Sequence, residues 1–159
     1  MPAIYLETQI KSTIEVCFDL SRNIDLHQIS TAETNEKAIA GRTKGLIEAG
    51  EFVTWQAKHF GLRLQLTTLI TGYNLPAFFT DEQVKGAFSS FKHEHSFEAF
   101  EGETIMKDVF DFKSPFGVLG KIFNALVLTG YMKALLITRN QTIKTYAENG
   151  EGQLMLQKL

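Results

Sequence analysis

The sequence predicts an α+β fold in which a curved, seven-stranded antiparallel sheet wraps around a long C-terminal helix. Three observations predict it. Apolar and polar residues alternate in short segments over most of 37–112, which is typical of antiparallel strands with one wet face. Two short helical segments follow a first alternating segment at the N-terminus. The last long segment is apolar on nearly all sides, and it is the only element long enough to cover such a sheet.

The N-terminal region predicts one strand followed by two short helices. Residues 3–11 alternate and read as the strand. Ser12 or Thr13 then has the side chain of a helix N-cap, and Asn23 or Asp25 can start the second helix.

Four further strands are expected at 37–44, 52–60, 62–73 and 77–80. A turn at Phe60-Gly61 sets a register that places Trp55 and His59 on the apolar face. Gly86 marks a bulge or bend before the next strand.

The segment Phe88–Phe112 predicts a hairpin whose apolar face carries ionisable side chains. With Gly102 and Glu103 as a two-residue loop, Glu101 pairs with Thr104. His93 is then expected opposite Phe112, His95 opposite Phe110, and Phe97 opposite Asp108. Because buried ionisable groups are costly unless they are paired, hydrated or used, this face indicates a pocket.

The long helix is expected from about Val118 to about Tyr146. One apolar stripe comprises Leu119, Phe123, Leu126, Gly130, Ala134 and Ile137, and the far side carries Leu128, Met132, Leu135 and Leu136. The lysines within this segment oppose a membrane span, since a charge near the bilayer centre costs several kcal/mol.

Composition and length bound the class of protein. The 159 residues suit a single domain over 1–159, and the net charge of −2 provides no basic surface for nucleic acid. The single cysteine, Cys17, excludes an internal disulfide and is expected to pack as a small hydrophobe. The N-terminus does not look like a signal peptide, so a cytoplasmic location is expected.

The residues Trp55, Ala57, His59, Phe60 and Gly61 form a Trp-x-Ala-x-His-Phe-Gly motif. It is followed at characteristic spacing by Phe79, Asp81, Gly86, Phe88, Phe91, His93, His95, Phe97, Thr104, Met106, Asp108, Pro115, Gly117, Gly120 and Arg139. This pattern resembles the START-like, or SRPBCC, superfamily of helix-grip folds, and within it a bacterial subgroup labelled cyclase/dehydrase. The resemblance covers nearly the whole chain and implies a deep apolar cavity between the sheet and the C-terminal helix.

Ligand contact within that cavity is predicted for a mainly aromatic set of residues: Trp55, His59, Phe79, Phe88, Phe91, His93, His95, Phe97, Asp108, Phe110, Phe116 and Phe123. A plain aromatic core is the alternative for any single phenylalanine. For His93, His95 and Asp108 the alternatives are ligand contact, a structural hydrogen-bond network, or acid–base catalysis.

The remaining polar residues suggest weaker hypotheses. A His-x-His pair on a strand can bind a metal if Asp108 or His59 joins it, but the sequence does not predict a metal or another cofactor. Lys121, Lys133 and Arg139 are expected at a solvated edge of the long helix, and contact with an anionic head group or membrane surface is the alternative.

Three classes of function follow. The leading one is binding or carriage of a small hydrophobic, lipid-like ligand in the cavity. The alternative is an enzyme of the cyclase/dehydratase type acting on a polyketide-like substrate there. The third is a protein that forms a homodimer, or docks a partner, through the far side of the C-terminal helix.

Overall fold

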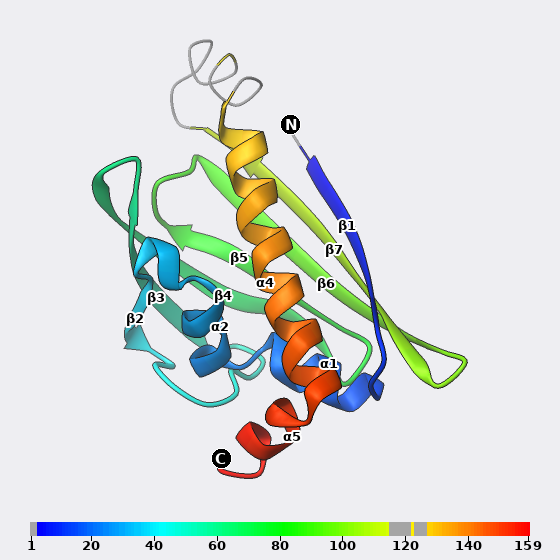
Figure 1. The fold of residues 1–159 in the computed structure, drawn as a ribbon. Coiled ribbons are helices and arrows are strands. Elements are labelled where there is room, and N and C mark those ends of the chain that lie inside the picture. The colour runs from blue at the N-terminus through cyan, green and yellow to red at the C-terminus, as the bar shows by residue number, and fades with distance from the viewer. Residues whose placement is uncertain (1–2, 115–121, 123–126) are drawn as a thin grey trace.

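The computed structural model describes residues 3–114, 122 and 127–159, which form a curved antiparallel sheet with helices packed on one face (Figure 1). The described strands lie in the order β1-β7-β6-β5-β4-β3-β2. Their bounds are β1 Ala3–Ile10, β2 Lys37–Gly41, β3 Phe52–His59, β4 Leu62–Asn74, β5 Phe78–Lys85, β6 Ser90–Phe100 and β7 Glu103–Lys113. The helices are α1 Ile14–Ser21, α2 Ile24–Ser30, α4 Thr129–Asn149 and α5 Glu151–Leu156, with a 3₁₀ turn at Ala32–Thr34. The predicted α+β fold is confirmed.

The two short helices begin where side chains cap them. Thr13 Oγ1 accepts a hydrogen bond from the backbone N–H of Val16, and Asn23 Oδ1 accepts one from Leu26. These caps satisfy N–H groups that have no partner within the helix. Helix α1 buries Phe18 and Cys17 completely against the sheet, so the expectation that Cys17 packs as a small hydrophobe is confirmed.

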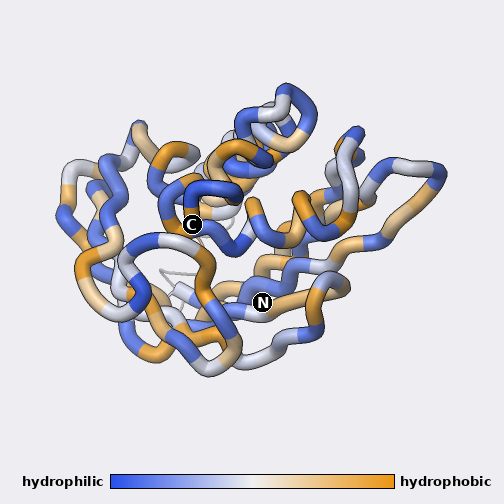
Figure 2. The backbone as a smooth tube through the Cα atoms, turned by 90° about the horizontal axis from the view of Figure 1, so that it is seen from below, coloured by the Kyte–Doolittle hydropathy of each residue, from blue (hydrophilic) through white to orange (hydrophobic). Residues whose placement is uncertain are grey.

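The β3–β4 hairpin has the predicted register. His59 pairs with Leu62 across Phe60 and Gly61, whose φ angles are 50° and 77°. Trp55 and Ala57 are buried, while polar residues alternate with them along the strand. One face of this hairpin therefore belongs to the interior. Figure 2 shows hydrophilic and hydrophobic segments interspersed along the backbone.

Two strands differ in length from the prediction. Strand β5 continues to Lys85, beyond the expected end at Thr80, because pairing with β4 on one side and β6 on the other holds its polar residues in the sheet. Strand β2 ends at Gly41, earlier than expected. The bend expected at Gly86 is present, directly after β5.

The β6–β7 hairpin has a register two residues away from the predicted one. Its loop is Glu101-Gly102, with φ angles of 51° and 82°, so Phe100 pairs with Glu103. A two-residue hairpin turn of this kind needs positive φ at both positions, and glycine suits the second position. The shift leaves the faces unchanged but places His95 opposite Asp108. By the same shift, His93 lies opposite Phe110 and Phe97 opposite Met106.

Helix α4 crosses the sheet (Figure 1). The residues of its predicted far side lie toward the interior. Leu128 and Leu136 are buried, and both line the interior together with Met132 and Leu135. Ile137, from the other predicted stripe, is half exposed. The side chains predicted for a dimer contact therefore face inward. Residues 118–121 and 123–126 of the predicted helix lie outside the described part of the chain.

The described helices include none that is long and apolar enough to cross a membrane.

Candidate functional site

A cavity of about 670 Å³ lies between the sheet and helix α4. The predicted contact residues that line it are Trp55, His59, Phe79, Phe88, Phe91, His93, His95 and Phe110. Phe97 is instead packed in the core, with its ring centroid 5.4 Å from that of Phe18. Asp108 lies behind the two histidines of β6, and Phe116 and Phe123 are outside the described residues. The structure thus gathers most of the predicted set around one space.

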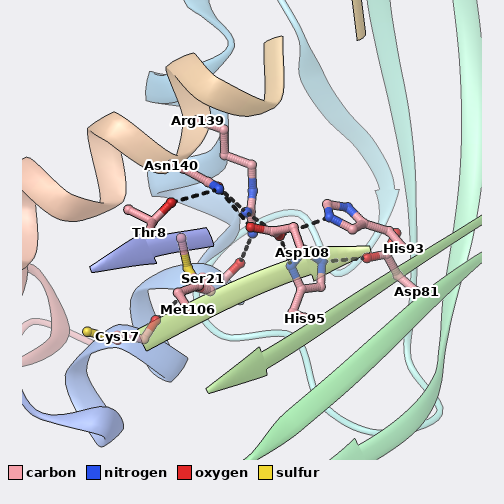
Figure 3. A network of polar contacts seen from close by, with 10 residues as sticks. All are labelled: Thr8, Cys17, Ser21, Asp81, His93, His95, Met106, Asp108, Arg139 and Asn140. Carbon is pink, nitrogen blue, oxygen red and sulfur yellow. Dashed lines mark hydrogen bonds and ion pairs between the residues drawn. The ribbon is translucent and has the colours of Figure 1, made fainter. Parts of the chain in front are cut away.

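Asp108 is the centre of a buried polar cluster on the cavity wall (Figure 3). Its Oδ1 lies 2.9 Å from His93 Nε2 and 2.9 Å from His95 Nδ1, and its Oδ2 accepts a hydrogen bond of 2.7 Å from Asn140 Nδ2. Although burial opposes ionisation, the hydrogen bonds from the two histidines hold the pKa of Asp108 well below its usual range. The cluster therefore surrounds a buried carboxylate with donors, as such a charge requires.

His93 offers the cavity a hydrogen-bond acceptor. Burial and repulsion from His95 lower the pKa of His93 to about 4, although Asp108 acts in the opposite direction, so the ring is neutral at pH 7. A neutral imidazole carries one N–H, and the contact with Asp108 assigns that hydrogen to Nε2. The other ring nitrogen, Nδ1, has no hydrogen-bond partner among the described residues. It is not fully enclosed by protein atoms, and His93 lines the cavity, so Nδ1 is accessible from the cavity.

His95 lies between two carboxylates. Its Nδ1 faces Asp108, and its Nε2 lies 3.1 Å from Oδ2 of Asp81 on β5. Burial works against ionisation of Asp81, but the hydrogen bond with His95 lowers the pKa of Asp81. Asp81 was not predicted as a site residue because β5 was expected to end at Thr80. If the strand had been predicted to extend past Thr80, Asp81 would have been expected on the same face as Phe79, because residues two apart in a strand share a face.

Arg139 is buried, so its prediction as a solvated residue is wrong. Its guanidinium donates to the backbone oxygen of Ser21 at 2.9 Å and lies 3.7 Å from Asp108 Oδ1. The neighbouring Asn140 also contacts Thr8 Oγ1 at 3.3 Å, so the cluster connects α4 with β1, α1 and β7. The helix burial pattern explains the error, because Arg139 follows Leu136 on the side of α4 that faces the sheet. Of the other two cations predicted at the solvated edge, Lys133 is exposed and Lys121 lies outside the described residues.

A second polar group lines another part of the same cavity. The ring of His27 lies over Trp55, with centroids 4.3 Å apart, and its Nε2 is 3.2 Å from Glu36 Oε2. His59 Nδ1 lies 2.8 Å from the hydroxyl of Tyr131 on α4. All four histidines of the chain therefore line this cavity. His27, Glu36 and Tyr131 were missed because their side chains meet the others only through the tertiary fold.

The cavity and its polar cluster together permit two kinds of chemistry. Apolar walls can bury the carbon skeleton of a ligand, and the acceptor nitrogen of His93 can orient a hydroxyl or receive a proton. The thiol of Cys17 takes no part, since it is fully buried and burial raises its pKa to about 11.

Comparisons with known proteins agree with this architecture. No model of a known protein family matches the chain, and no curated protein matches it either. Solved structures do match. The protein TTHA0849 of Thermus thermophilus has a TM-score of 0.70 at 14% identity, covering 92% of this chain and 100% of that one. Major latex-like protein 151 of Panax ginseng has a TM-score of 0.67 at 16% identity, covering 92% and 97%.

A START superfamily protein from Mycobacterium smegmatis is also similar, with a TM-score of 0.68 at 11% identity over 91% of this chain and 96% of that one. At these identities the likeness concerns the fold. The seven-stranded antiparallel sheet, the two short helices after the first strand and the long C-terminal helix are those that the sequence predicted. This chain therefore has a helix-grip fold.

Proposed function

We propose that the protein binds, and carries, a small hydrophobic ligand of lipid-like character in the cavity between the sheet and helix α4. One observation carries the proposal: an aromatic-lined space of about 670 Å³ has a polar cluster on its wall. This volume lies within the range of about 300–1,000 Å³ that is usual for small-molecule sites. Burial of apolar ligand surface at about 25 cal/mol/Å² supplies affinity, and the polar cluster supplies orientation.

The setting proposed for this activity is a single domain over residues 1–159 in the cytoplasm. The chain has one cysteine and so does not rely on a disulfide within itself, which suits a reducing compartment. The net charge of −2 does not favour nucleic acid as a partner.

The second candidate is catalysis of the cyclase/dehydratase type on a polyketide-like substrate held in the same cavity. His93 is the observation that favours it. A neutral imidazole with an accessible nitrogen is suited to accept a proton from a bound substrate, and Asp108 orients its ring.

The first experiment is native mass spectrometry of the purified protein, followed by organic extraction and mass analysis of the extract. A co-purifying apolar molecule supports the proposal and identifies its class. The purified protein is then titrated with 1-anilinonaphthalene-8-sulfonate, whose fluorescence increases in apolar sites.

Ala57→Phe is the informative variant in this titration. Ala57 is buried on the cavity wall, so the added ring occupies the space and should weaken probe binding at least tenfold. Gln56→Phe is the matched control because Gln56 lies on the opposite face of the same strand, where its side chain meets Gln65. Equal binding by both variants and the wild type contradicts the cavity as the binding site. Turnover of a ligand identified by extraction, abolished by His93→Gln, decides for the second candidate.

A further inference from the structure

Three side chains of the types that can bind a metal ion meet on the wall of the cavity. Asp81 on β5 pairs directly with His93 on β6, and His95 follows two residues later on the same face. One donor atom from each of the three lies within 4.8 Å of the other two, and all three residues line the cavity. Two imidazoles and one carboxylate form a ligand set that suits zinc and iron(II).

The rings of His93 and His95 are oriented by a buried carboxylate, as is usual for metal-binding histidines. A metal-bound histidine normally donates the N–H of its second ring nitrogen to a carboxylate, a backbone carbonyl or water, which fixes the tautomer and the ring orientation. Asp108 Oδ1 lies 2.9 Å from one nitrogen of His93 and 2.9 Å from one nitrogen of His95. Asn140 and Arg139 hold Asp108 in turn. A single buried carboxylate thus orients both rings and leaves the other nitrogen of each ring for another partner.

We propose that Asp81, His93 and His95 bind one divalent transition-metal ion, with zinc as the expected metal, and that the open coordination positions face the cavity. The third ligand is Asp81, in place of Asp108 or His59, which the sequence suggested. Asp108 lies behind the rings, and His59 is engaged with Tyr131.

The distances fit this site after a small contraction. Ligand atoms about 2.1 Å from a shared metal lie about 3.0–3.4 Å apart. His95 Nε2 and Asp81 Oδ2 are already 3.1 Å apart, where a hydrogen bond joins them. The metal replaces the proton of this hydrogen bond, and the widest separation closes from no more than 4.8 Å by side-chain rotation, since strand pairing fixes the backbone.

The proposal goes beyond ligand carriage and does not depend on it. Three protein ligands leave coordination positions for an oxygen of a bound molecule, as in zinc sites that act on substrates. An apolar molecule with a hydroxyl or carboxylate group would then be held at its polar end by the metal and along its skeleton by the aromatic walls.

The test uses the full chain after dialysis against a chelator. Cobalt(II) is titrated and followed by its visible absorption, which reports its coordination, and zinc is titrated by calorimetry. We expect saturation at one equivalent and loss of the cobalt spectrum in Asp81→Asn. Asp108→Asn should weaken zinc binding about 10–100-fold, as is usual when an outer carboxylate is removed.

Asp111→Asn is the matched control, because Asp111 lies on the other face of β7 and should bind zinc like the wild type. Asp81→Asn preserves shape, and circular dichroism verifies that the variant is folded. If Asp81→Asn fails to fold, His95→Gln replaces it in the same titration. Absence of saturable binding by the wild type, or wild-type binding by the folded Asp81→Asn or His95→Gln variant, overturns the proposal. A protein that binds zinc but no apolar probe leaves this site standing and refutes the proposed carriage.

Discussion

Asn140 Nδ2 donates a hydrogen bond of 2.7 Å to Oδ2 of the fully buried Asp108, and this contact joins helix α4 to strand β7. The two residues come from opposite sides of the interior. Because the carboxylate is charged and removed from water, the contact stabilises the closed arrangement of helix and sheet more than a surface hydrogen bond does.

Replacement of Asn140 by alanine should therefore destabilise the protein. The change leaves one oxygen of Asp108 without its donor, which costs about 1.5–3 kcal/mol in the free energy of unfolding. Urea denaturation followed by circular dichroism measures it. Gln141→Ala, at the next and exposed position, should change stability by less than about 0.5 kcal/mol. Equal effects of the two variants would show that Asn140 has no special role.

The contact between His59 and Tyr131 should control the rate at which a ligand exchanges. It joins the end of β3 to the first turn of α4, and the adjacent Phe60 both lines the cavity and is 54% exposed. This contact therefore lies where the cavity meets solvent. We expect Tyr131→Phe to speed association and release of an apolar fluorescent probe several-fold in stopped-flow measurements, with a smaller change in Kd. Tyr5→Phe, at a residue 70% exposed on β1, serves as the control, and equal rates in both variants would rule out the effect.

Glu36 should contribute to stability in a pH-dependent way. Burial raises its pKa, but the hydrogen bond and charge of His27, with help from His59, outweigh that effect and lower the pKa below 4.5. A carboxyl group whose pKa is lower in the folded state stabilises the protein above its unfolded pKa, and this stabilisation disappears as the pH falls through the folded pKa. The wild type should thus exceed Glu36→Gln in unfolding free energy by its largest amount above about pH 4.5. This difference should decrease as the pH falls below that value. A difference that stays constant from pH 3 to pH 7 contradicts this linkage.

Cys17 should react with thiol reagents only after unfolding. Its side chain is fully buried, and burial raises its pKa to about 11, so both access and thiolate fraction are small in the folded protein. In the presence of 5,5′-dithiobis(2-nitrobenzoic acid), absorbance should rise slowly without urea and rapidly above the unfolding midpoint. Rapid stoichiometric labelling of the folded protein is the contrary result.

Sequence patterns predicted the fold well because strand alternation and turn residues are local properties. Phe60-Gly61 is a case in which the turn and the register follow directly from the residues. The β6–β7 turn is less determined, since glycine at 102 has a glutamate on each side. Both possible turns keep the same residues on the inner face, so the hydrophobic pattern does not choose between them.

The candidate site was only partly predictable because its partners are distant in the chain. His93, His95 and Asp108 share a face of one hairpin, and their proximity follows from local pairing. Arg139 belongs to a helix that is apolar on several sides, and helical periodicity alone does not say which side meets the sheet. A buried role for this cation depends on Asp108, which only the tertiary fold brings within 3.7 Å.

Because all four histidines line one cavity, their side-chain NMR signals can report whether a ligand occupies it. In a nitrogen-15 NMR spectrum of the side chains, every imidazole resonance of the untagged chain comes from the wall of this space. Filling of the cavity would be recorded from several directions at once without any attached label. Resonances of His27 and His59 would describe one part of the space, and those of His93 and His95 another.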